Sequence, residues 1–340
     1  MKELKYIAVQ PDDIYYTWQV HMWLESLREL GHSDKAIVLV FIPGFRTKNL
    51  KWEQIVELYP EVEFVFYKDE ANELTPLIGT YIPVLRPWCL EKYFSEHPDM
   101  KDKAVFYCDS DTVFTEKFDI QAFVNDDVCY LSDTNSYINA TYFDSKIKDV
   151  LPNKLDKYKQ IDVLGDLSKI IGISREIAEK NNDDSGGAQY LLKNVDGEFW
   201  GDVKRDCITI RRYLMNINKT YFASEDKGFQ SWCADMWAVL WNLWKRDLKT
   251  KNIPEMEFSW ASDGIERVKR LPIFHNAGIV GDSMGDHLAF YKGKYHQGKD
   301  PFDDMKHLMA VMNHPVSKMR GTYYYLTRLL KLKEKYNLKY

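Results

Sequence analysis

Short apolar runs and helically spaced apolar residues alternate through the first third of the chain. The runs predict four strands, at residues 6–10, 36–42, 63–67 and 104–108. The helical spacing predicts three helices between them, at residues 14–30, 52–58 and 77–94. Pro83 and Pro87 predict a kink or a late start in the third helix. Strands that alternate with helices predict a mostly parallel sheet with helices on both faces.

The remaining two thirds of the chain predict further helices and one more strand. We expect a charged, mostly helical segment at 145–182, an aromatic-rich helix at 230–246, a strand at 271–274 and helices after residue 300. Asp183 to Ala188 predict a glycine-rich turn. In a purely structural interpretation of this turn, Asp184 or Ser185 caps a short helix at residues 189–192. The fold class predicted is therefore α/β, with a mixed, mostly parallel, Rossmann-like sheet and a helical C-terminal extension.

The composition narrows the class of protein. The chain has 340 residues and a net charge of −5, which argues against a surface coated in positive charge for nucleic acid. Its five cysteines are odd in number and form no C-x-x-C pair, so we expect neither a disulfide framework nor a zinc site. Charged residues interrupt the N-terminus, and no apolar run reaches about 20 residues. We expect a cytoplasmic protein without stable membrane insertion.

Two carboxylates directly follow the fourth predicted strand. Asp109 and Asp111 flank Ser110, and residues two apart in extended backbone face the same side. Ligands bind at the carboxyl ends of strands in such sheets, and carboxylate oxygens suit Mg²⁺ or Mn²⁺. The sequence therefore predicts a metal site here that would neutralise a leaving diphosphate. The alternative is a structural turn in which Asp109 caps a helix.

The run FYCDSDTVF resembles the D-x-D motif of glycosyltransferases with the GT-A fold. Four other segments follow the order of motifs in that family, namely VLRPW at 84–88, SGGAQ at 185–189, WCADMWA at 232–238 and HNAG at 275–278. The third is similar to the W-x-x-E-M-Y-A stretch of hydroxyproline arabinosyltransferases and peptidyl-serine galactosyltransferases. Asp235 replaces the glutamate of those relatives. Their basic loop is also displaced, because Lys292 and Lys294 come 17 and 19 residues after His275.

The resemblance implies a role for each of these segments. It makes His275 the third metal ligand and Asp235 the acceptor of the proton from the attacking hydroxyl. Gly186 and Gly187 would line the sugar pocket, with Gln189 near the anomeric carbon. Donor-binding roles go to Gln10, Arg86, Ser110, Gly186, Gly187, Lys292 and Lys294.

Each of these residues also has a structural interpretation. In this interpretation His275 is a histidine at the end of a strand that bonds to backbone, and Asp235 belongs to a solvated helix face. The two lysines suit an exposed turn. Glu225 and Asp226 compete with Asp235 as the base.

The resemblance also suggests substrates and domain limits. It implies a nucleotide-sugar donor, with a UDP-sugar favoured, and a catalytic domain at residues 1–300. Residues 1–115 would form the nucleotide-binding half and 116–300 the acceptor and sugar half, followed by a basic helical tail at 301–340.

The acceptor is the most open of these expectations. The missing anchor and the likeness to arabinosyltransferases favour hydroxymethylated cytosine in phage DNA, modified with an arabinosyl or similar sugar in the host cytoplasm. The basic tail favours it too, whereas the net charge opposes it. The alternatives are a cell-surface glycan or lipopolysaccharide precursor, or a non-catalytic module that binds nucleotides or glycans.

Overall fold

The computed structural model describes the whole chain except residues 225–226, 280–287, 297 and 337–340. It divides into two compact units. Unit 1 consists of Met1–Leu4, Asn72–Tyr107 and Phe123–Ile253, and unit 2 of Lys5–Ala71, Cys108–Ala122 and Pro254–Tyr340. Each unit takes segments from both sides of residue 115. The division of a catalytic domain into halves at that residue stays a prediction.

Unit 2 contains three parallel strands in the order β3-β2-β1. These are β1 (Leu4–Pro11), β2 (Ala36–Ile42) and β3 (Glu63–Lys68), and the helices α1 (Ile14–Glu29) and α2 (Lys51–Leu58) connect them. All seven residues of β2 are buried, as expected for an uninterrupted apolar run between two neighbouring strands. The Asp13 carboxylate accepts a hydrogen bond from the Tyr15 backbone N–H and so fixes the start of α1 just after β1.

A second, three-stranded sheet in unit 2 has the order β5-β10-β9. Its strands are β5 (Thr112–Phe114), β9 (Phe258–Trp260) and β10 (Ile273–His275), and α12 (Ile265–Arg270) links the last two. β10 pairs antiparallel with β5, so that His275 lies opposite Thr112. A residue late in the chain thereby reaches the strand that directly follows the acidic pair.

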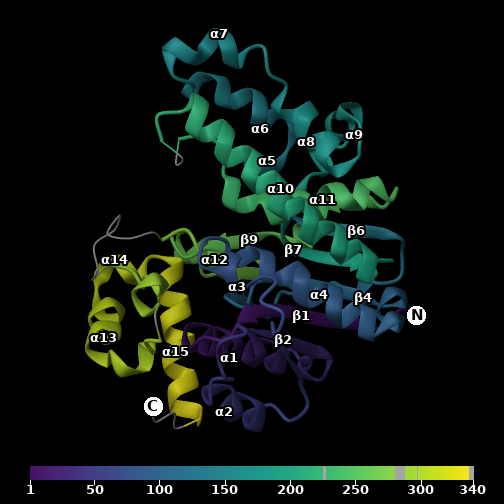
Figure 1. Ribbon diagram of the computed structural model, residues 1–340. Helices are drawn as coiled ribbons and strands as arrows, with labels where there is room; N and C mark the ends of the chain where they lie inside the picture. Colours follow the sequence, from purple (N-terminus) through teal and green to yellow (C-terminus); the bar gives the residue numbers. More distant parts are fainter. Residues whose placement is uncertain (225–226, 280–287, 297, 337–340) are drawn as a thin grey trace. The chain divides into compact units, whose positions relative to one another are not determined.

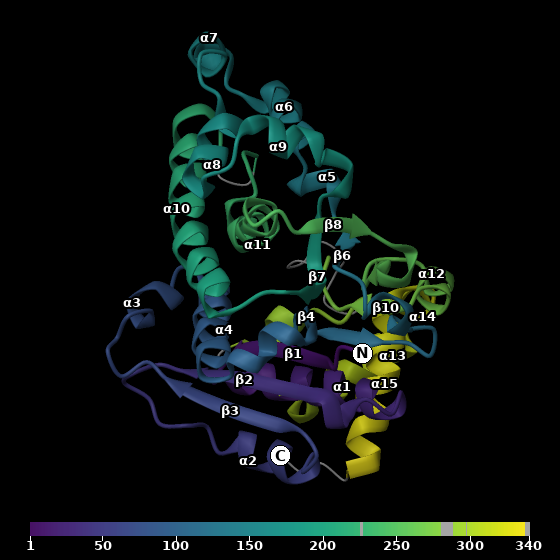
Figure 2. The ribbon, with the colours of Figure 1, turned by 90° about the vertical axis from the view of Figure 1, so that its right-hand side faces the viewer.

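The C-terminal segment of unit 2 is helical, as predicted. It forms α13 (Met305–Asn313), α14 (Pro315–Lys318) and α15 (Gly321–Tyr336), and Figures 1 and 2 show α15 beside α1. Tyr325 and Leu329 of α15 are fully buried in one cluster with Trp18 of α1 and Phe274 of β10. Burying a side chain such as leucine contributes roughly 1.5–3 kcal/mol. The tail is therefore part of the core of unit 2.

Unit 1 contains four strands in the order β4-β7-β6-β8. They are β4 (Ala104–Cys108), β6 (Val128–Asp133), β7 (Gly186–Lys193) and β8 (Lys249–Asn252). β6 pairs antiparallel with β7 and parallel with β8. The expectation of a turn at 183–188 followed by a helix at 189–192 is wrong, because Gly186 to Lys193 form a strand paired with β6.

The helices of unit 1 pack around a long central one, α10 (Gly197–Tyr221), which contacts α4, α8 and α11. Figure 2 looks along α11 with α10 beside it. The predicted helix at 77–94 is divided near its prolines into α3 (Thr75–Ile78) and α4 (Leu85–Glu96), while α11 (Ala234–Lys245) lies within the predicted aromatic-rich helix. The remaining helices are α5 (Asn135–Ile138), α6 (Ala140–Ser145), α7 (Leu155–Tyr158), α8 (Val163–Ile171) and α9 (Arg175–Lys180).

The predicted fold class is confirmed, since the strands form mixed, mostly parallel sheets with helices around them. Within the described ranges, no helix combines the length and the apolar character that crossing a membrane requires.

Candidate active site

The acidic pair lies in a tight turn between two buried strands of the chain. β4 ends at Cys108 and β5 begins at Thr112, whose backbone N–H donates to the Asp109 carbonyl at 3.2 Å. The backbone N–H of Asn276, the residue after β10, donates to the Asp111 carbonyl at 2.9 Å. The turn is thus bonded to the end of β10, and Asp109 does not cap a helix.

Three side chains predicted as metal ligands converge in unit 2. One ligand atom each from Asp109, Asp111 and His275 lies within 4.8 Å of the other two. The His275 Nε2 is 3.3 Å from Asp111 Oδ1 and 3.8 Å from Asp109 Oδ2. Asp111 and His275 are buried, whereas Asp109 is partly exposed. Two carboxylates and an imidazole at this spacing could hold one divalent ion.

An aromatic wall fixes the orientation of the His275 ring. The Trp260 ring is stacked on it, with centroids 5.2 Å apart and planes inclined by 27°. Trp260 pairs with His275 across the β9–β10 ladder, which explains the stacking. The imidazole therefore has little freedom to turn away from the carboxylates.

Lys292 supplies a positive charge at this cluster, because its ammonium group contacts Asp111 Oδ2. Lys294, two residues later, instead pairs with Asp304 at 3.4 Å. Burial alone would raise the pKa of the Asp111 carboxyl, but the charges of Lys292 and His275 outweigh burial and hold that pKa well below its usual range. A positive group thus already lies against Asp111, which indicates that this carboxylate suits a cation.

Other side chains around the cluster were not predicted from the sequence. Tyr15 stacks on His296 with ring centroids 3.9 Å apart. Burial first, and then the nearby Asp111 charge, raise the pKa of the Tyr15 phenol. Tyr15 is the second residue of α1, soon after the end of β1. The preference of ligands for strand ends was the signal that could have identified it.

Gln10 and Ser110, two predicted donor-binding residues, are buried in unit 2. Gln10 lies near the end of β1, and its Nε2 donates to the Leu39 carbonyl of β2 at 3.1 Å. One end of the amide is therefore held by the neighbouring strand. Donor binding by these two residues stays a prediction.

Asp235 and Arg86 form an ion pair in unit 1. Arg86 is the second residue of α4 and Asp235 the second of α11, and their Nη1 and Oδ2 atoms are 3.2 Å apart. The side chains are 25% and 10% exposed, so the pair is largely shielded from water. The Tyr81 hydroxyl accepts the Asp235 backbone N–H at 3.0 Å and donates to the Trp232 carbonyl at 3.3 Å. These contacts hold the predicted base at a defined position.

The predicted sugar-pocket residues lie on β7 of unit 1. A Cβ at Gly186 would lie 2.6 Å from the Ser132 carbonyl oxygen, and one at Gly187 would lie 2.7 Å from Met236 Cε. Position 186 therefore requires glycine because it packs against backbone, whereas the nearest atoms at Gly187 are the ends of side chains that can shift. Gln189 is fully buried on the same strand. Contact of these residues with a sugar stays a prediction, and the competing bases Glu225 and Asp226 lie outside the described residues.

The metal cluster belongs to unit 2, and the Asp235–Arg86 pair belongs to unit 1.

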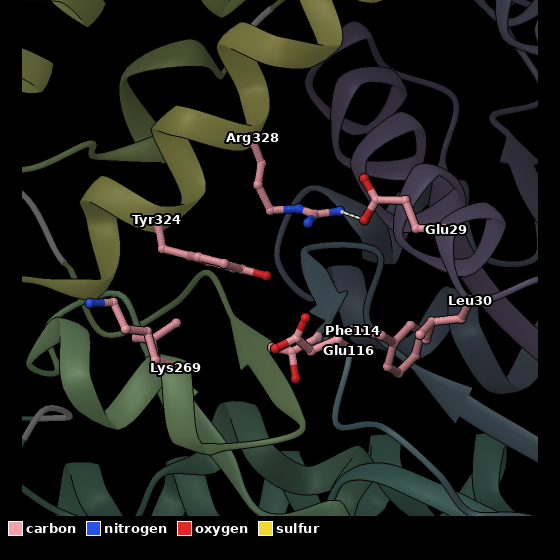
Figure 3. Close-up of a pocket in the computed structure, with 9 residues that line it drawn as sticks. Glu29, Leu30, Phe114, Glu116, Lys269, Tyr324 and Arg328 are labelled. Atoms are coloured by element: carbon pink, nitrogen blue, oxygen red, sulfur yellow. Dashed lines mark hydrogen bonds and ion pairs between the residues drawn. The ribbon is translucent and has the colours of Figure 1, made fainter.

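The basic tail is engaged in contacts with unit 2. Arg328 pairs with Glu29 at 2.6 Å, Lys335 pairs with Glu25 at 2.6 Å, and Lys333 donates to the Phe302 carbonyl at 2.9 Å. Figure 3 shows the Arg328–Glu29 pair in the wall of a cavity of about 440 Å³, with Tyr324 and Lys269 nearby. These cations stabilise the docking of α15.

No protein-family model and no curated protein matches the chain. Among solved structures, the apo bifunctional glycosyltransferase WbbM aligns with 12% identity and a TM-score of 0.45 over 97% of this chain. The alignment covers 52% of WbbM, so the chain spans about half the length of that protein.

Two further structures are similar at a lower level. Apo mouse xyloside xylosyltransferase 1 has 9% identity and a TM-score of 0.33, over 81% of this chain and 98% of its own. The galactosyltransferase LgtC, solved with donor and acceptor sugar analogs, has 10% identity and a TM-score of 0.39, over 91% and 95%. Likenesses this weak carry no conclusion about the function of this chain.

Proposed function

We propose that the chain is a metal-dependent glycosyltransferase of the GT-A type, which transfers a sugar from a nucleotide-sugar donor to a hydroxyl group. The observation that carries the proposal is the convergence of Asp109, Asp111 and His275 with a lysine ammonium at Asp111. A buried carboxylate is unfavourable without a positive partner, so this cluster favours the binding of a positively charged group.

Asp109, Asp111 and His275 would hold Mn²⁺ or Mg²⁺. The ion would neutralise charge on the diphosphate of a donor such as a UDP-sugar as the sugar leaves. Lys292 supports this assignment, because a lysine beside the metal ligands suits a phosphate oxygen as well as a carboxylate. Lys294 is the weaker candidate for the diphosphate, since it pairs with Asp304.

Asp235 is our candidate for the base. Its carboxylate would take the proton of the acceptor hydroxyl while the hydroxyl oxygen bonds to the anomeric carbon and the bond to the diphosphate breaks. Attack from the side opposite the diphosphate inverts the anomeric carbon. Arg86 would be a positioning residue that orients Asp235 through their 3.2 Å ion pair.

The acceptor predicted from the sequence is hydroxymethylated cytosine in DNA, which would receive an arabinosyl sugar. It is one of the two acceptor classes that the experiment below compares. Phosphate binding by the tail would require Arg328 and Lys335 to leave Glu29 and Glu25. These ion pairs favour the other acceptor class, a glycan precursor.

The deciding experiment is a screen of nucleotide sugars for Mn²⁺-dependent release of nucleoside diphosphate, with and without each acceptor class. We expect one donor to be hydrolysed, and Asp111→Asn and His275→Ala to lose at least about 100-fold in rate. Asp34→Asn, which changes an exposed acid of the same unit, is the matched control. Full metal-dependent hydrolysis in both site variants would show that the metal assignment is wrong.

A further inference from the structure

An open pocket in unit 1 is lined in part by residues just before α11. It has a volume of about 670 Å³, within the range of about 300–1,000 Å³ typical of small-ligand sites. Its walls come from the segment between α3 and α4, from α10 and from the residues before α11, and α10 contacts that first segment. The Tyr81 hydroxyl of this wall donates to the Trp232 carbonyl and accepts from the backbone N–H of Asp235. The pocket wall is therefore bonded to the backbone of the residue that carries the proposed base.

Trp232 gives the pocket an unusual exposed ring. All ten tryptophans lie in the described ranges; nine are buried or partly buried, whereas Trp232 is 60% exposed. Ile82, on the same pocket wall, is also exposed, at 39%. Exposed apolar surface in a concave site marks a place where a ligand binds. A flat indole face suits the apolar C–H face of a sugar ring.

The rest of the lining combines apolar side chains, among them Met215 and Phe229, with neutral polar ones. Thr80, Gln230 and Ser231 offer hydroxyl and amide groups for hydrogen bonds. Among the lining residues that the structure describes, Arg211 alone is charged. Its guanidinium donates to the Thr80 carbonyl at 2.7 Å and lies 4.6 Å from the centre of the Tyr81 ring.

This lining selects among acceptor classes. A DNA duplex is gripped mainly through several phosphates, and a single anchored arginine offers too little positive charge for that. The described lining contains no carboxylate that would attract a cationic acceptor. An aromatic and apolar surface with neutral donors and acceptors beside it instead fits an uncharged carbohydrate, whose rings have both apolar C–H faces and hydroxyl groups.

We infer that this pocket, which we call the Trp232 pocket, binds a neutral glycan whose hydroxyl group is the acceptor. Trp232 stacks on the sugar ring, Gln230 and Arg211 bond its hydroxyl groups, and the bound sugar presents a hydroxyl group on the side of Asp235. The inference rests on the proposed function for the role of the ligand as acceptor. The binding site itself stands independently of catalysis.

Binding can be measured without a donor, by ligand-observed NMR with a panel of neutral mono- to tetrasaccharides and with a short oligonucleotide that contains hydroxymethylcytosine. We expect at least one oligosaccharide to bind. Trp232→Ala should weaken that binding on the order of tenfold, the factor that corresponds to about 1.4 kcal/mol of lost contact. Phe45→Ala, which removes an exposed aromatic side chain from unit 2, should leave it unchanged.

The outcomes separate the two proposals. Oligosaccharide binding that depends on Trp232, without hydrolysis of any nucleotide sugar, would keep the Trp232 pocket and reject the proposed function. Donor hydrolysis together with no oligosaccharide binding, with equal binding by Trp232→Ala, or with binding of the oligonucleotide alone, would overturn the glycan inference and leave the proposed function standing.

Discussion

Replacing Lys292 by methionine tests the charge balance of the metal cluster most directly. The substitution keeps an unbranched side chain but removes the ammonium group at Asp111 Oδ2. Asp111 is 6% exposed at its side chain, and its other oxygen is 3.3 Å from His275. The variant would therefore leave two neighbouring carboxylates with the imidazole as their nearest partner in the cluster.

The size of the effect follows from the burial of the pair. Removing one partner of a fully buried ion pair costs about 3–5 kcal/mol, and an exposed pair contributes about 0–1 kcal/mol. Lys292 is 25% exposed while Asp111 is buried, so we expect Lys292→Met to lower the free energy of unfolding by about 2 kcal/mol without metal. Lys294→Met is the matched control, because its partner Asp304 is 37% exposed, and the loss should stay below about 1 kcal/mol.

Metal binding should change in the opposite direction. In the native chain a cation that enters the cluster competes with the Lys292 ammonium for the charge of Asp111. Lys292→Met removes this competitor, so Mn²⁺ alone should bind about tenfold more tightly by calorimetry, equivalent to about 1.4 kcal/mol. Affinity for the nucleotide sugar in saturating Mn²⁺ should fall, since a diphosphate contact is lost. Unchanged or weaker Mn²⁺ binding, or an equal stability loss in Lys294→Met, would refute the reasoning.

Two further predictions concern stability. Burial raises the pKa of the Asp300 carboxyl to about 6, above an unfolded value of about 3.9, so the free energy of unfolding should fall as pH rises from about 4 to 6. Asp300→Asn should remove this pH dependence in urea titrations and raise the free energy of unfolding by up to about 3 kcal/mol at pH 8. Asp303→Asn, a change at an exposed neighbour, should keep the pH dependence. Parallel pH profiles for wild type and Asp300→Asn would contradict this prediction. Gly186→Ala should lower the free energy of unfolding by about 1–3 kcal/mol, because the new Cβ would meet the backbone carbonyl of Ser132. Gly79→Ala is the control, because its Cβ would meet no atom within 4 Å. Equal midpoints of thermal unfolding for the two variants would show that the strand adapts to the extra methyl group.

The metal cluster could be predicted from the sequence because its geometry follows from local rules. A buried strand followed by Asp109 and Asp111 places both acids at a strand end, and the spacing of two lets them face the same side. His275 was predicted from its motif, and the structure explains its position by the β5–β10 ladder. The contact between Lys292 and Asp111 could not be predicted, because no periodicity links residues so distant in sequence.

The glycine-rich segment shows where local rules fail. Two adjacent glycines after Asp183 and Asp184 predict a turn, yet Gly186 and Gly187 begin a paired strand. Their lack of side chains serves close packing against Ser132 and Met236, a requirement that tertiary contacts set. β6 and α10 were not predicted. In α10, charged residues interrupt the apolar positions that the neighbouring helices cover.

The charge balance of the cluster has a consequence for the order in which ligands bind. Buried Asp111 needs a positive partner at all times, and Lys292 provides one when no metal is bound. Metal alone competes with that ammonium for the charge of Asp111, which weakens metal binding. A donor diphosphate offers the ammonium a new anionic partner, so metal and donor should each raise the affinity of the other, by the same factor. In Lys292→Met this mutual effect should shrink, because the shared ammonium is gone. The same lysine would thus stabilise the empty site and couple metal binding to the arrival of substrate.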